Sequence, residues 1–218
     1  MSGAFVVAID GPAASGKGTL ARRLAKRFGL AHLDTGALYR ATALLVLDSG
    51  GDAADPAAAE AAARRVGAQL LADPRLRDEA VTRASSVVAA IPAVRRALLE
   101  FQRGFAARPP AAARGAVLDG RDIGSVVCPQ ADIKLFVTAA TEVRARRRLD
   151  ELRARGTPAI YEEVLQELRE RDTRDAGREV APMTTAPGAV VIDTTALDAD
   201  MALARASDIV ARALAGSR

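Results

Sequence analysis

The sequence predicts an α/β fold, in which a parallel β-sheet carries helices on both of its faces. Short apolar runs, of the kind that form buried parallel strands, recur along the 218 residues. Segments with apolar residues at helical spacing separate these runs, and such alternation forms a parallel sheet with right-handed crossovers. A glycine-rich turn also follows the first strand and leads directly into a helix, which is typical of a phosphate-binding edge.

The N-terminal half is expected to contain two strands and then mostly helices. Asp34 or Thr35 can cap a helix that starts after the second strand, and proline stands at a favoured first position of the next helix. The expected strands are 4–9 and 30–34, and the expected helices are 20–28, 35 to about 49, 56–66, 78–90 and 92–107. Residues 67–77 are poorly patterned, with a short strand at 69–72 and a turn at Asp73-Pro74 as the expected features.

The C-terminal half returns to regular alternation. The expected strands are 115–119, 133–137 and 189–193, and the expected helices are 142–155, 161–175 and 198–214. A polar turn, Gly120-Arg121-Asp122, stands at the carboxyl end of the third strand. We therefore expect a single domain with a large apolar core.

Composition excludes several classes of protein. Half of the residues are apolar, and 31 Lys and Arg stand against 27 Asp and Glu, so the formal charge is only +4. Aromatic residues make up 3% of the chain, which argues against a stacking surface for single-stranded nucleic acid. Cys128 is the only cysteine, so no internal disulfide forms. No apolar stretch approaches the roughly 18 residues of a membrane helix. We expect a cytoplasmic monomer that binds neither nucleic acid nor membranes.

The clearest chemistry lies in residues 10–19, Asp-Gly-Pro-Ala-Ala-Ser-Gly-Lys-Gly-Thr. This stretch has the G-x-x-x-x-G-K spacing of a phosphate loop, whose backbone N–H groups surround a phosphate at the positive end of a helix. Gly11 and Gly16 permit close backbone approach, and Lys17 can reach the β- and γ-phosphates. Gly18 stands where Ser or Thr is usual and the hydroxyl follows at Thr19, a variant that resembles the nucleoside monophosphate kinases.

Polar residues gather at the carboxyl ends of the predicted strands, where open parallel sheets bind ligands. They are Asp10, Asp34, Thr35, Asp119, Arg121 and Asp122. Asp119 is a candidate Mg²⁺ ligand, directly or through water, and the alternative is a helix cap or turn residue. An arginine fork suits a phosphate, and a carboxylate suits an exocyclic amine.

A second charged cluster lies at residues 171–178. Arg171, Arg174, Asp175 and Arg178 recur at i, i+3, i+4 and i+7, which places them on one face if the helix persists. A solvated, salt-bridged helix face is the usual explanation of such a run. Phosphoryl transfer nonetheless needs several fixed cations around the migrating group, and arginines here and at 153–155 are candidates for that role.

Together, four spaced motifs resemble those of the bacterial cytidylate (CMP/dCMP) kinases. In order, they are residues 10–19, Asp34-Thr-Gly-Ala-Leu-Tyr-Arg40, Asp119-Gly-Arg-Asp122 and Glu170-Arg-Asp-Thr-Arg-Asp-Ala-Gly-Arg-Glu-Val-Ala-Pro182. The resemblance implies a P-loop NTPase-type sheet with a monophosphate-binding insert and a lid over ATP. Residues 1–218 would form one kinase domain, with its core at 1–50, 108–153 and 170–218, its insert at about 51–107 and its lid at about 154–169. Residues 67–78 are short for the small β-structure that many members carry in the insert.

The resemblance also implies roles for individual residues. The ATP phosphates would be held by Gly11, Pro12, Ala13, Ala14, Ser15, Gly16, Lys17, Gly18, Thr19 and Arg155, with Mg²⁺ at Thr19 and Asp119. Arg40, Arg121 and Arg178 would hold the CMP phosphate, and Arg171 and Asp175 would address the ribose or the bridging phosphates. Ser86, Arg95 and Asp122 would read cytosine, while Thr35 and Tyr39 would line the acceptor pocket. Lys17, Arg121, Arg171 and Arg178 would be the catalytic cations.

The predicted reaction is transfer of a phosphoryl group from ATP to CMP or dCMP, with Mg²⁺ bridging the donor phosphates. Uracil would turn an acceptor oxygen toward Asp122, which is a repulsive mismatch. One alternative is another small-substrate kinase on the same core, for UMP, AMP or shikimate, and a panel of acceptors separates these. A second is a basic, nucleic-acid-binding ATPase, which predicts salt-sensitive polynucleotide binding.

Three residues outside the motifs have more than one interpretation. His32 is expected to be structural rather than a general base, because the acceptor phosphate is already an anion. Cys128 is expected to be a small packed residue rather than a nucleophile. Tyr161, near the lid, either touches a nucleotide or packs against the adjoining helix.

Overall fold

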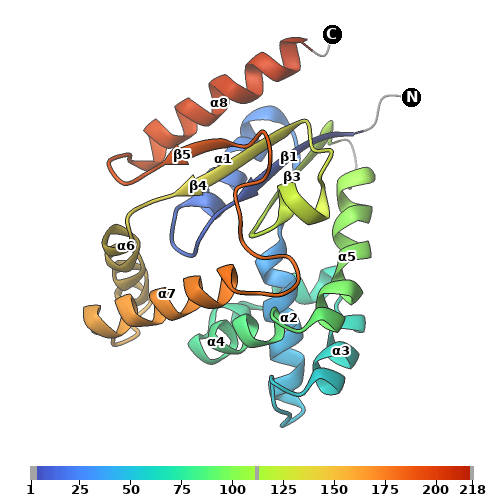
Figure 1. The fold of residues 1–218 in the computed structure, drawn as a ribbon, viewed down its shortest axis with the longest axis vertical. Helices are drawn as coiled ribbons and strands as arrows, with labels where there is room; N and C mark the ends of the chain where they lie inside the picture. Colours follow the sequence, from blue (N-terminus) through green and yellow to red (C-terminus); the bar gives the residue numbers. More distant parts are fainter. Residues whose placement is uncertain (1–3, 111–112, 217–218) are drawn as a thin grey trace.

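A five-stranded parallel sheet forms the centre of the protein, as the computed structural model of residues 4–110 and 113–216 shows (Figure 1). The strands lie in the order β2-β3-β1-β4-β5, and every neighbouring pair is parallel. Their bounds are β1 Phe5–Asp10, β2 Ala31–Asp34, β3 Gly115–Gly120, β4 Ile133–Thr138 and β5 Val190–Asp193. The predicted α/β class is therefore confirmed. β3 lies between two strands and is buried along its whole length, which explains its continuous apolar run.

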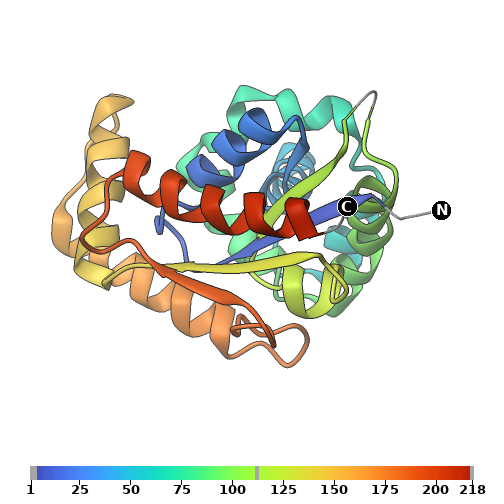
Figure 2. The same ribbon diagram turned by 90° about the horizontal axis from the view of Figure 1, so that it is seen from above.

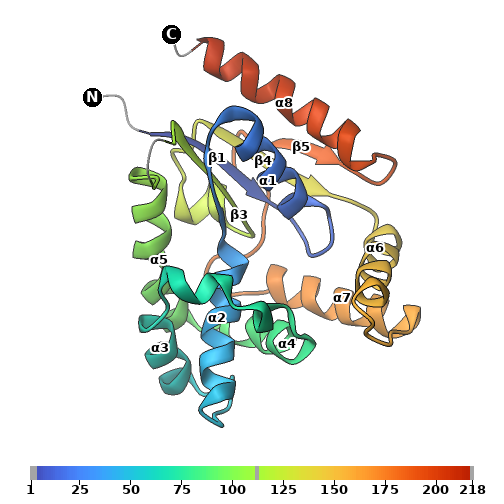
Figure 3. The same ribbon diagram turned by 180° about the vertical axis from the view of Figure 1, so that it is seen from behind.

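Helices cover both faces of the sheet. α1 (Lys17–Phe28) and α8 (Ala199–Gly216) lie together over one face, as Figure 3 shows. Because side chains alternate along a strand, Val7 and Ile9 of β1 pack against these two helices, while Ala8 points to the opposite core. That second core lies against α2 (Thr35–Asp48), α3 (Pro56–Arg64), α4 (Glu79–Val88) and α5 (Pro92–Ala107).

α6 (Thr141–Ala154) and α7 (Tyr161–Ala176) form a separate helical pair. Their own apolar cluster, which includes Leu149, Leu152, Val164 and Leu168, holds them together. From above, α6 and α5 lie at opposite sides of the molecule (Figure 2). α7 extends back toward α4, so the pair faces the helices that follow β2 (Figure 1). Within the described part of the chain, no helix has the length and apolarity to cross a membrane.

The expected strand at 69–72 is wrong. Residues 68–77 instead form two short 3₁₀ helices, η1 (Ala68–Ala72) and η2 (Pro74–Arg77). The apolar side chains of η1 pack against α2 and its core rather than along a sheet edge, because β2 and β5 occupy the edges elsewhere. Asp73, expected in a turn, caps η2 by accepting from the amide of Arg75 at 2.9 Å.

A wide turn that no sequence pattern indicated follows β3. Residues Ile123–Val127 form a π-helix, η3, in which Cys128 N–H donates to the carbonyl of Ile123 over 2.7 Å. Asp122 is its N-cap residue. π-Turns are rare and occur often at functional sites, and this one begins directly after the Arg121-Asp122 pair.

Candidate active site

The phosphate loop takes its shape from residues with positive φ. Gly11 has φ 147°, and a Cβ there would collide with the carbonyl oxygen of Val137 on β4. Ala14 also has a positive φ, of 58°, and Gly16 has φ 88° as the N-cap of α1. No side chain of the described residues caps α1, so the positive end of this helix remains available to an anion.

Lys17 begins α1 and is almost fully buried. Its Nζ donates to the carbonyl oxygen of Pro12 over 3.0 Å, which folds the side chain back over the loop. Burial, together with the nearby charges of Arg121 and Arg171, lowers the pKa of Lys17 to about 7 against the opposing effect of Asp119. A bound phosphate would reverse this effect, because an anion favours the charged amine.

Asp119, at the end of β3, is held in a fixed orientation. His32 Nε2 lies 2.7 Å from its Oδ1, and the Thr35 hydroxyl donates to its backbone carbonyl over 2.7 Å. Its other carboxylate oxygen, Oδ2, faces Gly18, where a Cβ would lie 3.5 Å away. His32 therefore orients Asp119, and one Asp119 oxygen remains directed toward the first turn of α1.

A second group of partners surrounds Asp122. Its carboxylate pairs with Arg95 of α5, and the two side chains are 7% and 8% exposed. Arg95 also lies over the Tyr39 ring, 5.5 Å from its centroid, and donates to the carbonyl of Ala89 over 3.2 Å. The ring and the carbonyl fix the guanidinium, so the pair presents one carboxylate and one arginine at a set position.

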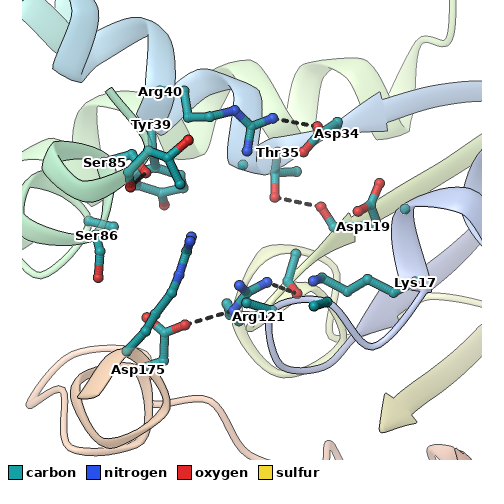
Figure 4. Close-up of a pocket in the computed structure, with 18 of the residues that line it drawn as sticks. Lys17, Asp34, Thr35, Tyr39, Arg40, Ser85, Ser86, Asp119, Arg121 and Asp175 are labelled. Carbon is teal, nitrogen blue, oxygen red and sulfur yellow. Dashed lines mark hydrogen bonds and ion pairs between the residues drawn. The ribbon is translucent and has the colours of Figure 1, made fainter. Parts of the chain in front are cut away.

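Asp175 of α7 organises the arginines between these two regions. It accepts from Arg121 Nε over 2.7 Å (Figure 4). It also pairs with Arg178. Burial acts to raise the pKa of Asp175, but these arginines and Arg171 hold it below its usual range. On α2, Arg40 pairs with Asp34 over 2.6 Å, and Asp34 also caps that helix.

These arginines have capacity for a further anion. Arg40, Arg171 and Arg178 each keep a buried Nε without a hydrogen-bond partner among the described residues. Burial and the charge of Arg121 lower the pKa of Arg171 to about 10. Buried donors of this kind are normally satisfied, so a ligand with several acceptor oxygens fits them.

One cavity of about 520 Å³ joins these groups. It is lined by most of the predicted site residues, namely Ala13, Ala14, Gly16, Lys17, Gly18, Thr19, Thr35, Tyr39, Arg40, Ser86, Arg95, Asp119, Arg121, Asp122, Arg155, Arg171, Asp175 and Arg178. Gly11, Pro12 and Ser15 do not line it and shape the loop from behind. Among the described lining residues, eleven Lys and Arg stand against five Asp and Glu, so the cavity suits polyanions.

Some expectations about the charged helices need correction. α7 ends at Ala176, so Arg178 is not on a continuous helix face with Arg171, although it still reaches Asp175. Arg174 does not line the cavity but donates to Ser86 of α4 over 2.6 Å. Of the arginines at 153–155, only Arg155 lines the cavity. Tyr161 packs within the α6–α7 cluster.

The sequence motifs missed three charged lining residues of α6, Arg147, Arg148 and Glu151. Together with Arg155 they are spaced at i, i+1, i+4 and i+8, which places all four on one side of a helix. This spacing was the feature of the sequence that could have identified them. Arg147 also donates to the Thr194 carbonyl over 2.7 Å, and Thr194 in turn donates to the Ser15 carbonyl of the loop over 3.0 Å. Cys128, as expected, is half-buried beside the core, and burial raises the pKa of its thiol to about 11.

A phosphate loop at the carboxyl edge of a parallel sheet, facing a second cluster of arginines and a buried carboxylate, defines a P-loop protein with room for two anionic groups. The model of the cytidylate kinase family matches residues 7–212, which is nearly the whole chain. The chain belongs to the cytidylate kinase family, which confirms the resemblance found in the motifs.

Curated relatives agree with this membership. A cytidylate kinase of Rhodospirillum rubrum is 57% identical over 207 residues, covering 95% of this chain and 97% of the relative. A cytidylate kinase of Granulibacter bethesdensis is 59% identical, covering 95% and 97%. Solved structures share the fold at lower identity: the protein TT1252 from Thermus thermophilus has a TM-score of 0.50 at 22% identity, covering 97% of this chain and 98% of its own. An uncharacterized protein from Eubacterium ventriosum has a TM-score of 0.52 at 12% identity, covering 94% and 98%.

Proposed function

We propose that the protein transfers the γ-phosphoryl group of ATP to CMP or dCMP, giving ADP and CDP or dCDP, as a monomer in the cytoplasm. One observation carries the proposal: a single cavity joins Lys17 of the phosphate loop to the buried Arg95–Asp122 pair. Arg121 and Arg171 lie close enough to Lys17 to lower its pKa, so the cations form one continuous cluster. The names of the curated relatives support the same activity.

The loop side would hold the donor. The α1 terminus and Lys17 would bind the β- and γ-phosphates of ATP, with Arg155 reaching the nucleotide from the end of α6. Asp119 fits Mg²⁺ because its Oδ2 faces the loop. Magnesium sites in proteins often use one or two carboxylates together with the phosphates of the substrate. Thr19 is a second candidate ligand on the first turn of α1. When bound, Mg²⁺ would neutralise charge on the donor phosphates.

The opposite side would hold the acceptor. The CMP phosphate would be bound by Arg40, Arg121 and Arg178. Asp175 would hold Arg121 and Arg178 in place through its ion pairs with them. Arg171 and Asp175 would also contact the ribose or the bridging phosphates. The unpartnered Nε atoms of Arg40, Arg171 and Arg178 support this arrangement, because a phosphate supplies the missing acceptors.

The base would lie against the Arg95–Asp122 pair, with Ser86, Thr35 and Tyr39 around it. The Asp122 carboxylate accepts from the cytosine N4 amine, and Arg95 and Ser86 donate to the N3 and O2 acceptors. Uracil has a carbonyl oxygen in place of the amine, so an acceptor would face the Asp122 carboxylate and the two would repel each other.

Transfer itself needs little chemistry from the protein beyond positioning and charge stabilisation. A CMP phosphate oxygen attacks the γ-phosphorus in line, the bond from that phosphorus to the β–γ bridging oxygen breaks, and ADP leaves. Lys17, Arg121, Arg171 and Arg178 would neutralise the migrating charge, which is where fixed cations contribute most. No strong base is needed, because the attacking phosphate is already ionised.

The insert and the lid, which lie between segments of the core, would close over the substrates. We assign residues 51–107 to an insert that binds the monophosphate and residues 154–169 to a lid, with the rest as the core. In this structure polar pairs join the insert to α6 and α7: Arg148–Glu79, Arg174–Ser86 at 2.6 Å and Arg83–Glu167 at 3.7 Å. Arg155, at the end of α6, also donates to the carbonyl of Arg77 over 3.4 Å. Closure would exclude water and so prevent hydrolysis of ATP before the acceptor binds.

A coupled ADP-release assay over CMP, dCMP, UMP, AMP and shikimate tests the proposal. We expect CMP and dCMP to give the highest kcat/KM. Faster turnover of UMP, AMP or shikimate would overturn the substrate assignment, while ATP hydrolysis at the same rate without any acceptor would overturn the kinase assignment.

A further inference from the structure

Asp10, the last residue of β1, makes contacts that the proposed mechanism does not use. It directly precedes the phosphate loop, yet its side chain is not among those that line the cavity. The residue is 3% exposed, and its two carboxylate oxygens accept from the amides of Ile123 and Gly124 over 2.7 and 2.8 Å. These amides are the first two of the π-helix η3, so Asp10 caps a turn that lies more than a hundred residues away in sequence.

Because Asp10 caps η3, the residue at the N-cap position, Asp122, does not have to do so. Asp122 occupies the N-cap of η3, and an aspartate at that position normally folds back to accept from the amides that follow it. The Asp122 side chain makes no such bond. It pairs with Arg95 instead.

Arg95 is held from other directions and cannot follow a displaced Asp122. The Ala89 carbonyl and the Tyr39 ring both contact its guanidinium. The backbone at Asp122 is fixed as well, because its carbonyl accepts from the amides of Val126 and Val127. The orientation of one side chain, that of Asp122, therefore decides whether the ion pair forms.

We propose that Asp10 is a positioning residue for base recognition: by capping η3 in place of Asp122, it keeps the Asp122 carboxylate turned toward Arg95 and the acceptor base. The inference rests on the proposed role of Asp122 in reading cytosine. It gives β1 two functions, since the strand ends in the phosphate loop and also sets the turn that selects the acceptor.

Replacing Asp10 tests this directly. In Asp10→Ala the amides of Ile123 and Gly124 lose their acceptor, so Asp122 should fold back onto them. We expect the ratio of kcat/KM for CMP to that for UMP to fall about tenfold, the lower end of the effect of losing one hydrogen bond to a charged group. The KM for CMP should rise more than the KM for ATP. Asp10→Asn keeps one acceptor oxygen and the size of the side chain, and it should give an intermediate ratio.

Asp132→Ala is a matched control. Asp132 accepts from the amide of Val6 over 2.7 Å, so its carboxylate also holds a backbone amide, here on β1 at the end away from the cavity. Its removal should leave the CMP-to-UMP ratio unchanged. In the double variant Asp10→Ala, Asp122→Ala the ratio should equal that of Asp122→Ala alone, because both changes act through one carboxylate.

A crystal structure of Asp10→Asn or Asp10→Ala separates failure of this inference from failure of the proposed function. An unchanged CMP-to-UMP ratio in both variants, or an Asp122 side chain still paired with Arg95 in the crystal, would overturn the inference. A wild-type enzyme without preference for CMP would overturn the proposed function, and the position of Asp122 in the variant crystal would still decide the role of Asp10.

Discussion

Arg95 and Asp122 form an ion pair with both side chains less than a tenth exposed, and both line the same cavity as the phosphate loop. A buried ion pair is weak evidence for stability, because desolvation offsets much of the attraction. The position of this ion pair beside a cavity that can hold a polar ligand fits a role in recognition. A ligand amine can donate to the carboxylate, and a ligand carbonyl can accept from the guanidinium. Two side chains that lie 27 residues apart in the sequence thus form one recognition surface.

We expect Asp122→Ala to weaken discrimination between CMP and UMP. The change removes both the acceptor for the N4 amine and the repulsion against the uracil O4. A hydrogen bond to a charged group contributes about 1.5–3 kcal/mol, so the kcat/KM ratio should fall by about tenfold to a hundredfold. Steady-state kinetics with both acceptors measures it. Glu60→Gln, which alters an exposed pair with Arg64, is the control and should keep the ratio. Unchanged selectivity in Asp122→Ala would refute the base-reading role.

Lys17→Ala should nearly abolish turnover. Lys17 is the buried cation of the phosphate loop, and loss of one fixed donor to developing charge typically lowers the rate about a hundredfold to a thousandfold. The measurement is ADP release with saturating CMP. Lys26→Ala, on an exposed turn of the same helix, should retain normal rates. Near-normal phosphorylation of CMP by Lys17→Ala would contradict the mechanism.

Much of this fold was predictable because its signals are local. Runs such as Phe5–Asp10 are apolar and short, and the loop glycines stand where positive φ or close approach requires them. The strand expected at 69–72 failed because two adjacent leucines satisfy a 3₁₀ turn on α2 as well as a strand. η3 was not predictable at all, since the Asp10 carboxylate that caps it is 113 residues away.

In the candidate site, too, some features could be predicted from the sequence and others could not. Motif residues were found because their spacing within a single loop or helix carries the chemistry. The ion pairs and hydrogen bonds between these residues could not be predicted from the sequence, because they join distant elements. Arg121 pairs with Asp175, 54 residues away, and His32 contacts Asp119, 87 residues away. These contacts depend on strand order, which residue spacing does not determine. They decide which charges are already neutralised and which remain for a ligand.

Asp119→Asn should weaken the effect of Mg²⁺ on ATP binding. Because His32 holds Oδ1, the oxygen that faces Gly18 is the one available to a metal, and an amide there is a poorer ligand than a carboxylate. Calorimetric titration of ATP with and without Mg²⁺ should show a tightening in the wild type that is at least about tenfold smaller in the variant. Binding without Mg²⁺ should change little. A variant that keeps the full Mg²⁺ effect would exclude Asp119 as a ligand.

ATP binding should also take up a proton through Lys17. With its pKa lowered to about 7 by burial, Lys17 is mostly neutral at pH 8 in the free protein, whereas the bound phosphates would favour the charged amine. Phosphate groups, with a second pKa near about 6, are already deprotonated at pH 8 and contribute little. Titration calorimetry in buffers of different ionisation enthalpy should therefore report uptake approaching one proton per ATP at pH 8, decreasing as the pH falls below 7. Lys17→Arg keeps the charge at every pH and should show almost no uptake. Equal uptake in the wild type and in Lys17→Arg would show that the proton goes elsewhere.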